Sequence, residues 1–139
     1  MQHAKDGDDM GFGEKVRQAR IAKQMSQEQL SEATGLSKRT ILNYESGERI
    51  PKKRETYAVL ADALGIDEAV LMDKNVDFVL KAHEVYGNDA MRQAMDLVAD
   101  VKALWAGGKI EEEDMDEIMR ALQEAYWDAK KKRKDRDHE

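Results

Sequence analysis

The stretch from Ser26 to Gly47, SQEQLSEATGLSKRTILNYESG, predicts two short helices joined by a tight turn. Ser26 and Ser37 each precede a helical segment, where a serine side chain can cap free backbone N–H groups. Gly35 and Gly47 follow the two segments, where glycine readily adopts the left-handed conformation that ends many helices. We therefore expect helices over 27–34 and 38–46.

The spacing within this stretch makes the two-helix prediction specific. Counting from Gln27, a small residue, Ser31, falls fifth, and a glycine, Gly35, falls ninth. A small residue lets the second helix cross the first closely, and glycine supplies a turn with positive φ. Four apolar residues at fixed offsets would then pack the pair against the remaining helices: Leu30, Leu36, Ile41 and Tyr44.

Further helices are predicted on both sides of this pair. Residues spaced by three or four indicate a helix over about 14–24, another over 54–64, and a short fifth helix capped by Asp67. After these, three more helices are expected, with breaks at Gly87 and Gly107. Because no strand-like alternation occurs, the predicted fold is all-α, with a five-helix domain followed by a C-terminal helical hairpin.

Charge divides the chain into parts with different partners. Residues 11–66 hold ten basic and seven acidic residues, a net +3, whereas residues 67–130 hold seven basic and sixteen acidic residues, a net −9. The last nine residues return to +2. The expected organisation is a flexible N-terminus over 1–12, a helix-turn-helix domain over 13–73, a C-terminal helical region over 76–130 and a charged tail over 131–139.

The first half of the chain resembles a known family. The residues that carry the likeness are MSQEQLSEATGLSKRTILNYESGERIP, residues 25–51, followed by LADALGI, residues 60–66. They are similar to the Cro-type, phage-lambda-repressor-like helix-turn-helix domain, also called the xenobiotic-response-element family. This resemblance implies a five-helix fold and DNA binding, and it places base reading in the first turn and the middle of the third helix.

The helix over 38–46 has two chemically different faces. Ile41 and Tyr44 would face the core, while Lys38, Arg39 and Asn43 share the opposite side. In a major groove, Arg or Lys pairs with guanine O6 and N7, and Asn pairs with adenine. We expect base contacts from Lys38, Arg39, Thr40 and Asn43, where Thr40 would meet a thymine methyl or a phosphate.

Phosphate contacts are expected from residues around this helix. The resemblance implies that Gln27, at the start of the second helix, clamps a phosphate beside free backbone N–H groups. The other expected phosphate contacts are Ser37, Arg49, Lys52, Lys53 and Arg54. The family also has an ion pair that joins the first and third helices, and the resemblance assigns it here to Arg20 and Glu45.

The two long helices on either side of Gly107 carry wide apolar faces and would form a hairpin. Two helices cannot hide two such faces alone, so we expect a second copy of the chain to cover them, with packing on the first domain as the alternative. The expected homodimer contacts are Met91, Met95, Val98, Trp105, Ile118, Leu122 and Tyr126.

Several functional classes find no support in the sequence. No cysteine, no clustered histidines and no glycine-rich phosphate loop are present, so we expect no enzyme activity, no cofactor and no metal. No apolar run approaches the roughly 20 residues of a membrane span, and the expected location is cytoplasmic. The predicted function is a DNA-binding transcriptional regulator, more specifically a repressor. The alternative is an antitoxin-like module whose acidic C-terminal helices bind a partner protein.

Overall fold

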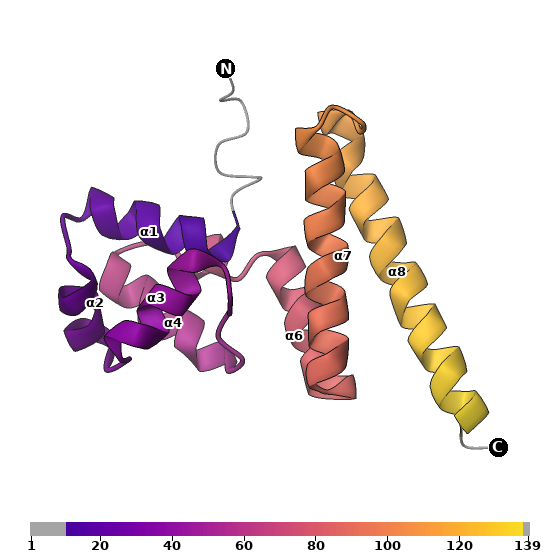
Figure 1. Ribbon diagram of the computed structural model, residues 1–139, viewed down its shortest axis with the longest axis horizontal. Helices are drawn as coiled ribbons and strands as arrows, with labels where there is room; N and C mark the ends of the chain where they lie inside the picture. The colour runs from indigo at the N-terminus through magenta and orange to yellow at the C-terminus, as the bar shows by residue number, and fades with distance from the viewer. Residues whose placement is uncertain (1–10, 138–139) are drawn as a thin grey trace. The chain divides into compact units, whose positions relative to one another are not determined.

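The computed structural model describes residues 11–137, and this part of the chain is built from helices with no strand (Figure 1). The helices are α1 (Phe12–Ala22), α2 (Gln27–Thr34), α3 (Lys38–Ser46), α4 (Arg54–Leu64), α5 (Glu68–Leu71), α6 (Lys74–Tyr86), α7 (Asn88–Ala106) and α8 (Glu112–Asp137). The all-α prediction is confirmed, and so are the predicted bounds of α2, α3 and α4. No helix in the described part is both long and apolar enough to cross a membrane.

The helix ends follow from the capping residues. The Ser26 side chain accepts a hydrogen bond from the Gln29 backbone N–H at 3.0 Å, and the Gln29 side chain accepts one from the Ser26 N–H at 2.7 Å. This reciprocal pair satisfies two N–H groups that have no partner inside the helix. Gly35 and Gly47 take φ values of 79° and 87° and end α2 and α3 as predicted.

The chain forms two compact units that meet between Met91 and Arg92, within α7. The helix-turn-helix domain predicted over 13–73 lies within the first unit, and the C-terminal region predicted over 76–130 begins in it. Helix α6 belongs to the first unit. The residue that caps its N-terminus, Asp73, accepts a hydrogen bond from the Lys15 amine of α1 at 2.9 Å, and the same amine donates to the Val70 carbonyl at 3.0 Å. The first unit therefore extends beyond its five predicted helices.

The core of the first unit includes a residue that the sequence placed in a flexible segment. Phe12 is buried, and its ring lies edge-on to the rings of Tyr44 and Tyr57, with centroids 5.7 and 5.3 Å away. Helix α1 thus runs over 12–22 rather than 14–24. The predicted flexible segment over 1–12 is wrong at Phe12, and residues 1–10 lie outside the described residues.

Gly13 sets how closely α1 approaches α3. A Cβ atom at this position would overlap the Tyr44 carbonyl oxygen and would lie 2.9 Å from the Glu45 carbonyl oxygen. Both neighbours are backbone atoms, so they cannot move aside as a flexible side chain can. The absence of a side chain at Gly13 is therefore a condition of this helix contact.

The second unit contains the hairpin of α7 and α8, which are joined by residues 107–111 (Figure 1). Near this connection, Val101, Trp105, Met115 and Met119 are all buried in the single chain. These four side chains therefore need no second copy of the chain to be buried. Helix α8 also continues to Asp137, so the predicted tail is helical as far as the described residues extend, and residues 131–136 are exposed.

Candidate nucleic-acid interface

Helix α3 is fixed to α1 by an ion pair between Arg20 and Glu45. The Arg20 Nε lies 2.7 Å from one Glu45 oxygen, and its Nη2 lies 3.0 Å from the other. The two side chains are only 12% and 5% exposed. The hydrogen bond to Glu45 raises the pKa of Arg20, with a smaller opposing effect of burial. The pair has the location that the family resemblance implies.

Gln27 belongs to the same network. Its side-chain amide donates to a Glu45 carboxylate oxygen at 3.1 Å, so α2, α1 and α3 meet at one carboxylate. The third Arg20 donor, Nη1, reaches the Met25 carbonyl at 2.9 Å. The sequence assigned Gln27 to a phosphate, whereas here its amide holds Glu45.

Two predicted DNA contacts form the N-terminal cap of α3. The Ser37 hydroxyl accepts from the Thr40 backbone N–H at 3.0 Å and donates to the Thr40 hydroxyl at 2.9 Å. Ser37 is exposed and Thr40 is half-buried. Both hydroxyls therefore lie at the start of the helix.

The outward face of α3 carries the remaining predicted base contacts. Lys38 and Arg39 are exposed and Asn43 is half-buried, while Ile41 and Tyr44 on the other side are buried. The Lys38 amine lies 3.2 Å from the Glu28 carboxylate of α2. Arg39 makes no hydrogen bond or ion pair to any residue that the structure describes. One further side chain on this face, Leu42, is 45% exposed.

The basic residues after α3 fall into two groups. Arg49 and Lys53 are exposed. The Lys52 amine donates to the Asn88 side-chain oxygen at 3.1 Å. Arg54 is held by two carboxylates of α6.

Arg54 forms an ion-pair cluster with α6. Its Nε and Nη2 donate to the two Glu84 oxygens at 2.8 and 3.2 Å, and its Nη1 donates to Asp77 at 2.8 Å. The hydrogen bonds to Glu84 and then to Asp77 raise the pKa of Arg54, and the hydrogen bond from Arg54 lowers the pKa of Glu84. The sequence missed this cluster because residues 23 and 30 positions apart leave no local pattern.

The residues predicted to form a dimer interface differ in exposure. Met91, Val98 and Trp105 are buried in the single chain. Met95, Ile118 and Tyr126 are half-buried, and the Tyr126 ring lies 5.3 Å from the ring of Trp127. Leu122 is exposed. Of the seven predicted contacts, only these last four have surface that a second copy could cover.

The acidic run Glu111–Asp114 lies at the start of α8, where carboxylates interact favourably with the helix dipole. Within residues 11–137, no group of three or more His, Asp or Glu side chains is arranged to hold a metal ion.

Comparison with known proteins supports a helix-turn-helix domain in the first unit. Residues 12–72 match a family described as a helix-turn-helix domain. Over 74 residues the chain is 35% identical to the cryptic phage CTXphi transcriptional repressor RstR of Vibrio cholerae. This match covers 51% of the chain and 66%, just under two thirds, of the repressor. Residues 12–72 therefore hold a helix-turn-helix domain, in agreement with the resemblance to Cro- and lambda-repressor-type domains.

Proposed function

We propose that the chain is a sequence-specific DNA-binding transcriptional regulator that acts as a repressor and reads the major groove with α3. The observation that carries the proposal is the division of α3 into a buried inner face and an outer face with donor side chains. The Arg20–Glu45 pair supports it, because it holds this helix in one orientation before DNA arrives. The similarity to a phage transcriptional repressor favours repression.

The base contacts follow from the chemistry of the outer face. Arg39 has no partner among the described residues and carries a planar group that matches guanine O6 and N7. Asn43, one turn further along, suits adenine. Lys38 would exchange Glu28 for a second guanine or a nearby phosphate, since a pair with both side chains mostly exposed is worth little.

The phosphate contacts are assigned to exposed groups that hold no partner on another helix. Ser37 lies at the start of α3, with Thr40 beside it, and Arg49 and Lys53 are exposed. Gln27, Lys52 and Arg54 already hold partners within the chain, so they would stabilise the domain rather than bind the backbone. This reduces the set of phosphate contacts expected from the sequence.

We also propose that the regulator acts as a homodimer through α8. Ile118, Leu122 and Tyr126 follow one another every four residues, so they form a row on one side of this helix, and all three retain exposed surface. A two-fold pair of domains would read half-sites about 34 Å apart. Linking the two domains makes the second binding step effectively intramolecular.

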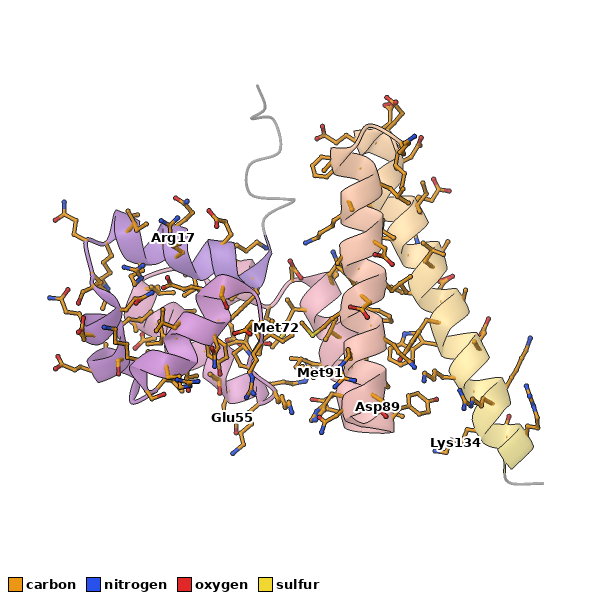
Figure 2. All side chains as sticks on the ribbon, viewed as in Figure 1. Arg17, Glu55, Met72, Asp89, Met91 and Lys134 are labelled. Atoms are coloured by element: carbon orange, nitrogen blue, oxygen red, sulfur yellow. The ribbon has the colours of Figure 1, made fainter. Side chains whose placement is uncertain are left out.

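The DNA proposal is tested by selecting sites from random duplex DNA with the full chain. Binding to a selected site should weaken steeply with salt because phosphate contacts release counterions. Arg39→Ala should relax the preference at one or two positions and weaken binding by about 1 to 3 kcal/mol. Arg17→Ala, on the exposed surface of α1 (Figure 2), removes the same charge and should leave the selected sequence unchanged. An unchanged Arg39→Ala profile would overturn the base assignment.

The dimer is tested separately by light scattering. The full chain should have twice the mass of one copy, and Leu122→Lys should be monomeric, because it places a charge in the row on α8. Leu104→Lys, at an exposed leucine on α7, is the control and should remain dimeric. A monomeric full chain would rule out this part of the proposal.

A further inference from the structure

The outer face of α3 contains an apolar side chain that the predicted contacts do not use. Leu42 is 45% exposed, whereas its neighbour Ile41 is fully buried. A single exposed leucine is ordinary on a protein surface and by itself indicates nothing. Leu42 differs from an ordinary surface leucine because it shares a helix face with the hydrogen-bonding side chains of Lys38, Arg39 and Asn43.

Helical geometry places Leu42 inside the proposed reading surface. Residues three and four apart are neighbours on a helix. Leu42 therefore lies beside Lys38 and Arg39 on its N-terminal side and beside Ser46 on its C-terminal side. Arg39 and Asn43 are themselves four apart, and Leu42 immediately precedes Asn43. A major groove that receives Arg39 and Asn43 would therefore also receive Leu42.

We infer that Leu42 determines specificity by covering the methyl group of a thymine next to the base that Arg39 reads. The inference rests on the proposed function and names one further element of the recognised sequence. Leucine has no donor or acceptor, so it cannot satisfy the polar edge of guanine, cytosine or adenine in the groove. The thymine C5-methyl is the apolar group that the major groove offers.

Thr40 is the other residue considered for a thymine methyl, and its position argues against that role. It is half-buried, and its hydroxyl and backbone N–H are both bonded to Ser37 at the cap. Leu42, in contrast, has nearly half of its surface available for contact. Covering this surface with a methyl group removes apolar area on both sides from water, which favours thymine over the other bases.

The sharpest test changes only the DNA. After a binding site has been selected with the full chain, each thymine is replaced in turn by deoxyuridine, which lacks the methyl group and keeps the same base-pairing edge. Loss of one buried methyl corresponds to roughly four-fold weaker binding, and we expect this loss at one thymine per half-site, adjacent to the base that responds to Arg39→Ala.

The second arm links that methyl to Leu42. In Leu42→Ala, replacement of the same thymine should change binding by much less than in the wild type, because the partner of the methyl is absent. Val59→Ala serves as the matched control, since Val59 on α4 is 43% exposed, and this variant should retain the full deoxyuridine effect. Leu42 is exposed, so the Leu42→Ala protein should melt at the wild-type temperature.

Three results would overturn the inference: no thymine whose replacement weakens binding, an equal deoxyuridine effect in the wild type and Leu42→Ala, or a sensitive thymine remote from the Arg39 position. All three can occur while the protein still selects a DNA sequence, which leaves the proposed function intact. Failure to select any sequence would instead remove the proposed function, and this inference with it.

Discussion

The two compact units of the chain are built in different ways. The first unit has six helices of 4 to 13 residues, with capping side chains and ion pairs between helices that lie far apart in the sequence. The hairpin of the second unit consists of the 19-residue α7 and the 26-residue α8, with buried methionine and tryptophan side chains near their connection. Orienting a nine-residue reading helix requires specific polar contacts, whereas two long helices can associate through apolar stripes.

The tryptophans make this difference measurable. The chain has two tryptophans, Trp105 and Trp127, and both lie in the second unit. Tryptophan fluorescence therefore follows the unfolding of the second unit, while far-UV circular dichroism follows helices in both. Each change below is expected to affect one signal more than the other.

The largest effect is expected from Glu45→Ala. It leaves the Arg20 guanidinium, only 12% exposed, without its carboxylate, and it also removes the acceptor of Gln27. Breaking one side of a largely buried pair should lower the free energy of unfolding of the first unit by about 3 kcal/mol. Circular dichroism should show an early transition, with the fluorescence transition unchanged. Glu48→Ala, at an exposed position nearby, should leave both transitions at the wild-type midpoint.

Gly13→Ala should follow at roughly 2.5 kcal/mol, because the added methyl overlaps backbone atoms of α3 and the two helices must separate. The matched control is Gly11→Ala, where a Cβ atom would meet nothing within 4 Å. Thermal unfolding followed by circular dichroism distinguishes the two. Equal stability of these variants would show that α1 and α3 can separate freely.

Met119→Ala tests the second unit. The methionine is 5% exposed, and its removal should cost about 2 kcal/mol through lost apolar contact and the cavity that remains. The fluorescence transition of the second unit should move to a lower midpoint. In circular dichroism, only the part of the transition that comes from the second unit should move with it. Leu104→Ala, at an exposed leucine of the same hairpin, should shift it little. A shift that also moved the circular dichroism transition of the first unit would mean that the two units unfold together.

The sequence was sufficient for the features that are encoded locally. Serine and aspartate caps, left-handed glycines and apolar spacing placed α2 to α5 within the first unit, because each of these signals acts over a few residues. The burial of Phe12 was not predicted because this residue stands between two glycines, before the start of the predicted helix.

Contacts between distant residues were predicted in only one case. The Arg20–Glu45 pair was expected because the family resemblance implied it, not because of any pattern in the residues themselves. The Arg54 cluster with Asp77 and Glu84 has no such precedent, and it crosses the boundary that the sequence placed at 73–76. The guanidinium of Arg54, expected from the sequence at a DNA phosphate, is thus paired with two carboxylates while it remains 40% exposed.

The smallest predicted effect concerns this cluster and separates it from the Arg20–Glu45 pair. Arg54, Asp77 and Glu84 each retain about 40% exposure, so water and salt weaken their attraction. Glu84→Gln should therefore cost only about 0.5 kcal/mol, as exposed pairs do. Glu55→Gln, an exposed position on α4 with the same change in charge, is the control.

The dependence on pH identifies the origin of this small effect. Hydrogen bonding to Arg54 lowers the pKa of Glu84 in the folded protein, so the pair stabilises the fold above the ordinary glutamate pKa of about 4.3. The contribution is lost as the pH falls through the lowered value, where Glu84 becomes protonated in the folded state as well. The stability difference between the wild type and Glu84→Gln should thus be constant near neutral pH and shrink in acid, and it should also shrink in high salt. A difference that persisted under both conditions would mean that the Glu84 side chain stabilises α6 by packing rather than by charge, and Arg54 would then be available to a DNA phosphate after all.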